Sequence, residues 1–334
     1  MPEERALLYC AGGGIGDSLL ATLVGRALQK RFKHIDVLTL PAHREALEHV
    51  EGIDRVAVDA GEDEPALARR LAHKKYAACI VSWATPRTAR IPHAARIPIR
   101  VGQDRRLYSW RFTHRVTVRS EIGDITTHWS QILLDYARAL GCDTDETVPS
   151  FIPSAADREE ADGLLARLGL APASYSMLHP ANAVASQRGI WPLEGWIALT
   201  AFIRRRFGTP VLVTGSEEDR AIAEAIASSA GALSIAGHTT IGAFAAVAQN
   251  ARFFTGITTG SMHIAAAVGA RTVGIFPFQS DTPERWAPLG PHTAIVRATY
   301  PCRNGERKET CPDYACVAHL DVERVIAAME SLEA

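Results

Sequence analysis

The sequence predicts an α/β protein in which two doubly wound parallel-sheet domains follow one another along the chain. Short apolar runs rich in β-branched residues alternate with segments of helical periodicity, which favours parallel strands connected by helices. A length of 334 residues suits about two domains of ordinary size. The proline-containing segment 143–153 interrupts the alternation, so we expect domains at 1–153 and 154–334.

In the N-terminal domain, the continuous apolar run 6–10 predicts a buried first strand. The glycines within 12–16 end this strand before a helix over 17–32, where apolar residues recur at helical spacing. Further strands are expected near 35–40, 55–59, 78–83, 97–102 and 115–118, with helices near 43–50, 64–74 and 128–141.

The C-terminal domain begins with a helix expected near 157–169, and Pro192 suits the first turn of a second helix over 193–207. Strands are expected near 175–179, 211–214, 233–236, 253–255, 272–276 and 294–297, with further helices near 217–229, 239–249 and 260–269. We expect the final helix of the chain to pack back toward the N-terminal domain. Ligands of doubly wound sheets bind outside the carboxyl ends of the strands, which predicts a site in a cleft between the two domains.

Composition excludes several classes of protein. A formal net charge of −1 argues against a general electrostatic attraction to nucleic acid. No apolar run approaches the roughly 20 residues that span a bilayer. The start of the chain lacks the basic-then-apolar order of a signal peptide, so we expect a cytoplasmic protein. Six cysteines in a chain of this length do not indicate a disulfide framework.

The first motif is the glycine-rich segment that follows the first strand and ends at Asp17. Its glycines stand at 12, 13, 14 and 16, which does not fit the Gly-x-Gly-x-x-Gly spacing of NAD(P)-binding proteins. A carboxylate at the start of the helix would also oppose a phosphate there. Asp17 is therefore either a helix N-cap or a general base that takes a proton from a hydroxyl nucleophile.

The second motif is the turn between a strand near 253–255 and the helix near 260–269. A helix that begins at Gly260 and Ser261 leaves its first N–H groups unpaired, beside the hydroxyls of Thr258 and Thr259, and this favours anion binding. An ordinary strand-to-helix turn with a hydroxyl cap remains the alternative. Arg188, in the loop after the strand near 175–179, can offer a planar fork to a phosphate or be a solvated loop charge.

The third feature is a concentration of arginine over 87–119. Nine arginines, including Arg90, Arg105 and Arg106, occur there with Asp104 as the only acid, which indicates an anionic partner. Tyr108, Trp110 and Phe112 are interleaved with them, so nucleic acid is an alternative partner, but no nucleic-acid-binding module accompanies them. A solvated face is the other alternative.

The fourth feature lies near the end of the chain, where three thiols and one imidazole could complete a tetrahedral zinc site. Its members are Cys302, Cys311, Cys316 and His319. Their spacing lacks the paired Cys-x-x-Cys arms of common zinc sites. Reduced, packed cysteines are the alternative, and we predict that no metal is required.

Taken together, these residues resemble the heptosyltransferase-type enzymes of glycosyltransferase family 9, which build bacterial lipopolysaccharide and related glycans on two-domain GT-B folds. The resemblance covers most of the chain. It rests on Gly16-Asp17-Ser-Leu-Leu-Ala, His128 with the helix after it, His179-Pro-Ala with Trp191-Pro192, the segment from Gly256 to His263, and Trp286-x-Pro288.

The resemblance implies roles for several residues. Asp17 would be the catalytic base, and Glu217 and Glu218 would lie near the donor nucleoside. The turn that would hold the donor diphosphate comprises Thr259, Gly260, Ser261, Met262 and His263. Arg90, Arg105, Arg106 and His128 are the residues that we expect at the acceptor.

Two positions depart from the family pattern. Family members usually carry an acidic residue where this chain has Thr258, and a lysine where it has Gly189. Arg188 can replace the charge of that lysine, whereas no residue replaces the carboxylate, which the family associates with the donor sugar. These departures leave the donor sugar open.

The resemblance implies an inverting transfer of a sugar, heptose in particular, from a nucleotide-diphosphate donor such as ADP-heptose to an anionic lipopolysaccharide-core or related glycan acceptor. It implies no cofactor, no nucleic acid, and a peripheral contact with the cytoplasmic face of the inner membrane. A non-catalytic nucleotide-sugar or glycan-binding protein and an NAD(P)-dependent oxidoreductase are the alternatives, and the retained Asp17 favours an enzyme over a binding protein.

Overall fold

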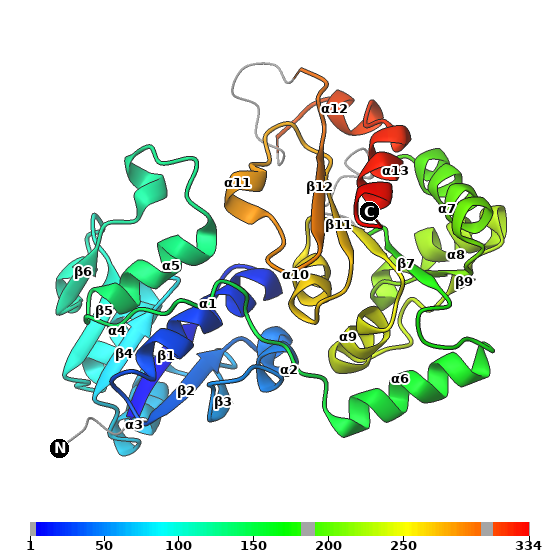
Figure 1. The fold of residues 1–334 in the computed structure, drawn as a ribbon. Helices are drawn as coiled ribbons and strands as arrows, with labels where there is room; N and C mark the ends of the chain where they lie inside the picture. The colour runs from blue at the N-terminus through cyan, green and yellow to red at the C-terminus, as the bar shows by residue number, and fades with distance from the viewer. Residues whose placement is uncertain (1–4, 182–190, 302–309, 334) are drawn as a thin grey trace. The chain divides into compact units, whose positions relative to one another are not determined.

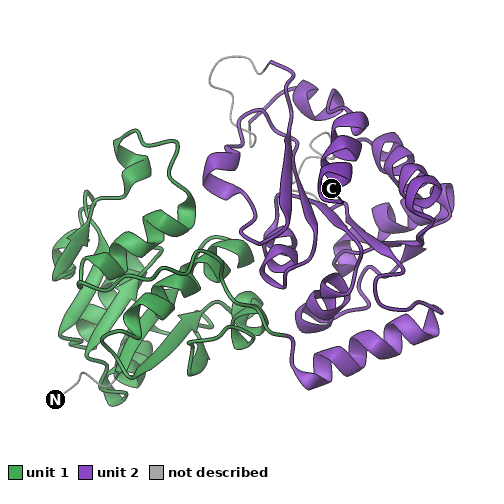
Figure 2. Cartoon of the chain, viewed as in Figure 1, with its two compact units in different colours: residues 1–152 green, residues 153–334 purple. Residues whose placement is uncertain are grey.

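The computed structural model describes residues 5–181, 191–301 and 310–333 of the chain. The chain divides into two compact units, Met1–Ile152 and Pro153–Ala334 (Figure 2). Each unit contains one six-stranded sheet with helices packed against it (Figure 1).

The first unit alternates strands and helices from its beginning. Its strands are β1 (Arg5–Cys10), β2 (His34–Thr39), β3 (Arg55–Val58), β4 (Ala78–Val81), β5 (Ile99–Gln103) and β6 (His114–Val116). Its α-helices are α1 (Ile15–Leu28), α2 (Arg44–Glu48), α3 (Glu64–His73), α4 (Pro86–Ala94) and α5 (Trp129–Arg138). Short 3₁₀ helices are η1 (Pro41–His43), η2 (Ser109–Arg111) and η3 (Arg119–Ile122).

The second unit repeats this pattern. Its described strands are β7 (Ser176–His179), β8 (Val211–Val213), β9 (Leu233–Ser234), β10 (Phe254–Ile257), β11 (Thr272–Phe276) and β12 (Thr293–Arg297). Its described α-helices are α6 (Ala155–Arg167), α7 (Leu193–Phe207), α8 (Arg220–Ala230), α9 (Ile241–Gln249), α10 (Gly260–Ala267), α11 (Pro283–Trp286), α12 (Ala315–Ala318) and α13 (Val322–Ser331). The 3₁₀ helix η5 (Glu217–Asp219) precedes α8.

The two sheets have the same topology. Their strand orders are β3-β2-β1-β4-β5-β6 and β12-β11-β10-β7-β8-β9, and the pairs at the centre of each sheet are parallel. The order reverses between β1 and β4 in the first sheet and between β7 and β10 in the second. In doubly wound sheets this reversal marks the ligand site at the carboxyl ends. The predicted fold, two doubly wound parallel sheets, is confirmed.

Each sheet is buried because its central strands are apolar on both faces. Leu7, Tyr9, Cys79 and Val81 belong to the core of the first unit. In the second unit, Val325 and Met329 of α13 lie in the same core as Trp191 and Val273. The final helix packs on β11, β12 and α7 of its own unit, and its expected packing back toward the N-terminal domain stays a prediction.

The sequence pattern did not predict α4, which lies in the arginine-rich segment. Thr85 caps this helix by accepting a hydrogen bond from the Thr88 N–H at 3.1 Å, and Pro86 occupies its first turn. Pro92 within the helix masks the helical pattern because proline usually ends a helix. None of the helices in the described part of the chain combines the length and apolar character that a membrane crossing requires.

Candidate functional site

In the first unit, Asp17 lies in the first turn of α1, just beyond the carboxyl end of β1. Its Oδ2 accepts a hydrogen bond from the Gly14 N–H at 2.8 Å, so the carboxylate caps the helix. Its Oδ1 is buried and accepts no hydrogen bond from the described residues. Burial raises the pKa of Asp17, against the opposing effects of the Gly14 N–H, of His43 and of the Trp129 side chain. A partly desolvated carboxylate with a raised pKa suits general-base chemistry.

The glycines before Asp17 let two side chains approach the backbone. A Cβ on Gly12 would lie 2.2 Å from Cδ1 of Trp83, and a Cβ on Gly13 would lie 2.6 Å from Oδ2 of Asp17. Gly13 also has a φ of +70°, a left-handed conformation that favours glycine. Packing of Trp83 and Asp17 thus accounts for these glycines without a bound dinucleotide.

Trp83 is a member of this site that the sequence reasoning missed. It follows β4, the strand that neighbours β1 in the sheet, and its side chain remains 40% exposed. Its ring meets Trp129 of α5 edge-on, with 6.4 Å between the ring centroids. The strand order brings these residues beside Asp17, so they could not be found from their sequence spacing.

In the second unit, the predicted turn at 258–261 lies directly after β10. Thr259 is the residue before α10 and has an extended backbone, but its hydroxyl donates to the Ile257 carbonyl at 3.2 Å instead of capping the helix. Thr258 to Ser261 are partly exposed, whereas Met262 and His263 are buried. The start of α10 therefore offers its backbone N–H groups and positive dipole end at the carboxyl edge of the sheet.

His179 ends β7 beside Gly256 of β10 and is a second residue that the sequence reasoning did not assign to the site. Its side chain is 6% exposed, and its Nδ1 has no hydrogen-bond partner among the described residues. Burial lowers the pKa of His179 to about 4, so the imidazole is neutral at pH 7. Arg188, which was predicted to face the same turn, lies outside the described residues, as does Gly189.

The two predicted nucleoside-binding acids lie in η5, after β8. Both Glu217 and Glu218 are exposed. Glu217 accepts a hydrogen bond from Nε of Arg220 at 2.8 Å, and this ion pair lowers the pKa of Glu217. Arg220 also contacts Nε2 of His238 at 3.2 Å. Because β8 neighbours β7, η5 lies at the same edge of the sheet as the 258–261 turn.

The chain was compared with families and solved structures of known proteins. The family model described as glycosyltransferase family 9 (heptosyltransferase) matches residues 65–315, which is more than half of the chain. The chain belongs to glycosyltransferase family 9. No curated protein sequence matches it significantly.

Solved structures share the fold of this family 9 protein. A family 9 glycosyl transferase from Veillonella parvula superposes with a TM-score of 0.86 at 18% identity, covering 99% of this chain and 98% of the other. ADP-heptose lps heptosyltransferase II of E. coli gives 0.78 at 18% identity, covering 99% and 100%. E. coli heptosyltransferase WaaC with ADP gives 0.73 at 17% identity, covering 98% and 99%.

The arginine-rich segment of this glycosyltransferase carries less unpaired charge than its composition suggests. Arg90 pairs with Glu64 at 2.6 Å, and Nη1 of Arg106 donates to Glu121 at 3.1 Å. Arg87 and Arg119 likewise pair with Asp59 and Asp135. Asp59 and Glu64 precede the arginine-rich segment, and Glu121 and Asp135 follow it. The composition of the segment alone therefore does not include the acids that pair with its arginines.

Two of the predicted acceptor residues differ from these paired arginines. Arg105 is exposed and forms no ion pair with a described residue, and its φ of +60° is unusual for a residue with a side chain. His128 is the N-cap of α5, where Nδ1 accepts from the Ser130 N–H at 3.2 Å. The structure thus gives His128 a capping role, whereas Arg105 presents its charge to solvent.

The cysteines near the end of the chain are only partly described, because Cys302 lies outside the described residues. Sγ of Cys311 accepts from the Tyr314 N–H at 3.3 Å, and Cys316 is buried. The His319 ring lies against Tyr300, with 4.3 Å between ring centroids. Within 5–181, 191–301 and 310–333, no three His, Cys, Asp or Glu side chains form a group suited to a metal ion.

Proposed function

We propose that this family 9 glycosyltransferase inverts the anomeric centre as it moves a heptose from ADP-heptose to an anionic lipopolysaccharide-core or related glycan acceptor. The observation that carries the proposal is Asp17. Its carboxylate is held by the Gly14 N–H at the carboxyl end of β1, where doubly wound sheets bind ligands. Burial raises its pKa, and a base whose pKa approaches the working pH is the more effective one.

In the proposed reaction, Asp17 removes the proton of an acceptor hydroxyl while that oxygen attacks the anomeric carbon of the donor. The bond between the anomeric carbon and the diphosphate oxygen breaks, and its electron pair leaves with the diphosphate. The negative charge that develops there is stabilised by backbone N–H groups at the start of α10. Oriented donors at a developing charge are commonly the largest catalytic contribution, and one such donor is worth roughly 3 kcal/mol. The step as written needs no metal.

ADP is the nucleotide that the comparisons favour for the donor. The E. coli heptosyltransferase WaaC has been solved with ADP and with ADP-2-deoxy-2-fluoro heptose. In this chain, the partly exposed turn at 258–261 supports diphosphate binding, because a helix start favours anions. We propose that Arg188 adds its charge to this turn and that Glu217 and Glu218 lie toward the nucleoside.

We propose that the acceptor binds the first unit and is a glycolipid, which would bring the protein to the surface of a membrane. Exposed apolar side chains support this peripheral contact. Leu107 is fully exposed, and Trp110, Ile122 and Ile125 are 57%, 58% and 67% exposed. The ion pair of Arg106 with Glu121 joins the two loops that carry them, and the unpaired Arg105 adds positive charge beside Leu107.

The proposal predicts that Asp17→Asn lowers the rate of transfer by about 10²–10⁴, the usual worth of a general base. ADP affinity should stay within a few-fold, because the side chain serves the acceptor. Transfer is measured with ADP-heptose and a lipopolysaccharide-core acceptor. ADP binding is measured as the rise in melting temperature that follows from ligand binding to the native state. Asp63→Asn, at the exposed start of α3, is the matched control.

Three outcomes would contradict the proposal. Full transfer activity in Asp17→Asn would leave Asp17 as a helix-capping residue only. Stabilisation of the protein by NAD(P), with no stabilisation by ADP or UDP, would instead favour the oxidoreductase alternative. Binding of ADP-heptose by a wild-type protein that transfers it to no acceptor would favour a non-catalytic binding protein.

A further inference from the structure

His43 lies at the carboxyl edge of the first sheet, close to Asp17. It is the last residue of η1, which follows β2, and β2 pairs with β1. Its side chain is buried, with 6% exposed. Nδ1 of His43 is 2.9 Å from Oγ of Ser18, the residue next to Asp17 in the first turn of α1. This buried hydrogen bond fixes the imidazole against the turn that carries the candidate base.

Asp17 and His43 are ionisable neighbours, and the groups that surround Asp17 come from three elements. From α1 itself, Asp17 receives the Gly14 N–H; from α5, it faces the indole of Trp129; and from η1, it faces His43. His43 favours the ionised form of Asp17, and Asp17 favours the charged form of His43. The buried contact of His43 with Ser18, the neighbour of Asp17, places the imidazole where such an interaction would link the protonation of the two groups.

We propose that His43 is a positioning residue that, anchored by Ser18, controls the protonation of Asp17 in the enzyme. An imidazolium beside the carboxylate favours its ionised form, and the ionised carboxylate in turn favours the imidazolium. The pair therefore keeps Asp17 ionised to lower pH than burial alone would allow. The significance for catalysis rests on the proposed function, whereas the coupling itself does not.

The coupling is tested directly by following the histidine rings of the full-length protein by NMR during a pH titration. Burial lowers the pKa of His43, and Asp17 opposes this. Asp17→Asn removes the opposing charge, so the pKa of His43 should fall further. Asp54→Asn is the control, because Asp54 pairs with His34 at 3.3 Å and its loss should leave the titration of His43 unchanged. An unchanged His43 titration in Asp17→Asn would overturn the proposal.

The role in the reaction is tested by the pH dependence of kcat/KM for His43→Asn. The asparagine amide can keep the hydrogen bond to Ser18 but carries no charge, so the variant should fold. Its acidic limb should move to higher pH because Asp17 loses the cation that favours its ionised form, and the KM for ADP-heptose should not change. Ser18→Ala should move the limb in the same direction, and His34→Asn should not move it.

If the acidic limb of the kcat/KM profile lies at the same pH in His43→Asn and in wild type, His43 has a purely structural role and the proposal is overturned. The NMR titration requires no transfer activity, so a failure of the proposed function would be recognised separately. In that case, the NMR result alone decides whether His43 and Asp17 are coupled.

Discussion

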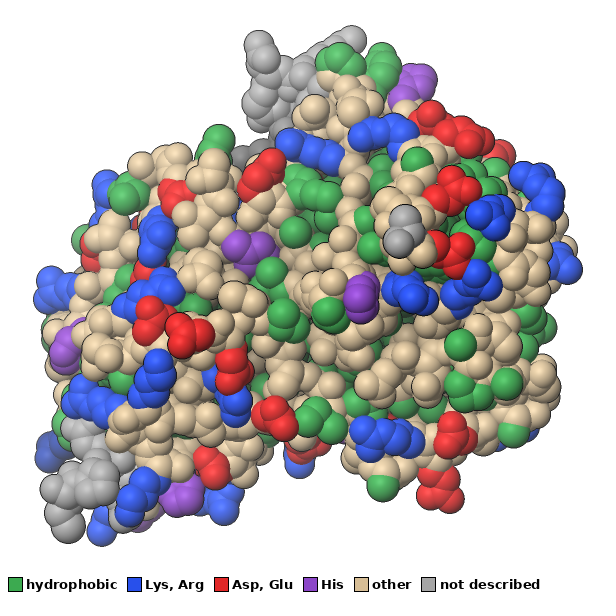
Figure 3. All heavy atoms as spheres, viewed as in Figure 1, with side chains coloured by type: hydrophobic (Ala, Val, Ile, Leu, Met, Phe, Trp, Pro, Cys, Tyr) green, Lys and Arg blue, Asp and Glu red, His purple; other side chains and the backbone are tan. Residues whose placement is uncertain are grey.

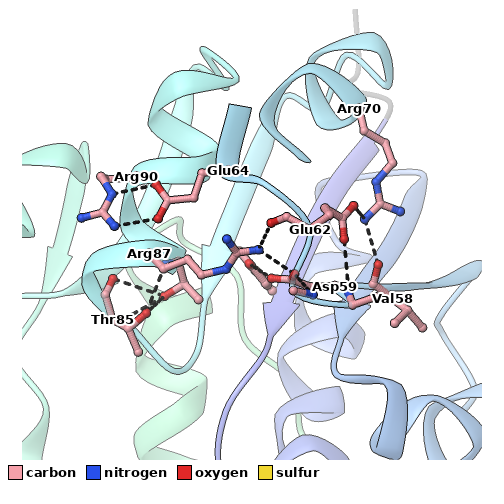
Figure 4. A network of polar contacts seen from close by, with 12 residues as sticks. Val58, Asp59, Glu62, Glu64, Arg70, Thr85, Arg87 and Arg90 are labelled. Carbon is pink, nitrogen blue, oxygen red and sulfur yellow. Dashed lines mark hydrogen bonds and ion pairs between the residues drawn. The ribbon is translucent and has the colours of Figure 1, made fainter. Parts of the chain in front are cut away.

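Asp59, the residue after β3, joins three segments of the first unit through one buried carboxylate. It accepts hydrogen bonds from the Tyr9 hydroxyl at 2.5 Å, from Arg87 at 2.8 Å and from the Gly61 N–H at 3.1 Å. Arg87 also donates to the Glu62 carbonyl at 2.9 Å (Figure 4). The network ties the first turn of α4, which follows Trp83, to the loop before α3.

The pKa of Asp59 makes the contribution of this network depend on pH. Burial raises the pKa, but the hydrogen bonds from Tyr9 and Arg87 outweigh burial, so the folded pKa lies below its ordinary value. Stability from Asp59 is therefore present above the unfolded pKa of about 3.9 and is lost as pH falls through the folded pKa. Asp59→Asn should cost roughly 1.5–3 kcal/mol at pH 7, the usual worth of hydrogen bonds to a charged group.

Urea unfolding at pH 7 and at pH 3 checks this prediction. The difference between wild type and Asp59→Asn should shrink at pH 3, because the Asp59 carboxyl of the unfolded chain takes up a proton below its pKa of about 3.9. The exposed Asp63 provides the control, since Asp63→Asn should change stability little at either pH. A difference that is the same at both pH values would show that shape, and not charge, determines the role of Asp59.

At the scale of single elements, α10 carries a prediction about the donor sugar. Thr258 precedes this helix and is partly exposed. A carboxylate accepts several hydrogen bonds from sugar hydroxyls, whereas a threonine offers one shorter hydroxyl. Thr258→Asp should therefore increase the preference for ADP-heptose over GDP- and UDP-linked sugars by about 1–3 kcal/mol, the worth of a charged hydrogen bond. Transfer and binding are measured for each donor.

Thr258→Ser is the control for this substitution, since it keeps one hydroxyl and adds no charge. If wild type already discriminates among these sugars by more than about a thousandfold, as sites with strong polar recognition do, Thr258 is not the residue that sets sugar specificity. Another residue would then recognise the sugar hydroxyls.

A helix or strand could be predicted where its sequence pattern lies within a few neighbouring residues. β1 and β11 are short continuous apolar runs, and α7 begins after Pro192 and ends at Gly208, so their patterns lie within a few residues. α4 combines two prolines with threonine, isoleucine and histidine, which favour helix less than its alanines and arginines do. Only its cap at Thr85 and its buried Ala89 and Ile91 show its helical nature. Propensity and composition were weaker guides there than capping.

Residues of the candidate site could likewise be predicted where they lie in one short segment of the sequence. Asp17 and the 258–261 turn could be found from the sequence because the helix start and its side chain lie in one short segment. His43 and Trp83 could not, because they reach the site through the pairing of β1 with β2 and β4. His179 belongs to a motif of the family resemblance, but its place in the site follows from the pairing of β7 with β10. Strand order is a property of the folded sheet, and a single sequence does not display it.

For the whole molecule, the net charge of −1 conceals local differences. Basic and acidic side chains are interspersed over the visible face (Figure 3), and pairing across elements compensates many of the arginines. Arg105 is an exception that matters for the proposed membrane contact. It has no acidic partner among the described residues, whereas the neighbouring Arg106 pairs with Glu121. Lipid charge should therefore act mainly through Arg105.

Co-sedimentation with phosphatidylglycerol vesicles checks this prediction. Arg105→Gln should weaken binding by a few-fold, because one basic residue near an anionic surface is worth about 1 kcal/mol, and Arg106→Gln should weaken it less. Leu107→Ser should weaken binding to the same vesicles through lost apolar contact. Binding of wild type to neutral phosphatidylcholine vesicles as tightly as to phosphatidylglycerol vesicles, with no loss of phosphatidylglycerol binding in Arg105→Gln, would rule out a charged membrane surface as the partner.

The close approach of Trp83 to Gly12 has a practical consequence. Trp83 is 40% exposed and lies against the glycine loop that positions Asp17, whereas Trp191 and Trp196 of the second unit are almost completely buried. A ligand that binds beside Asp17 would change the water around the Trp83 indole and leave Trp191 and Trp196 unaffected. Intrinsic fluorescence should therefore serve as a label-free signal of acceptor occupancy, and Trp83→Phe would identify the source of that signal.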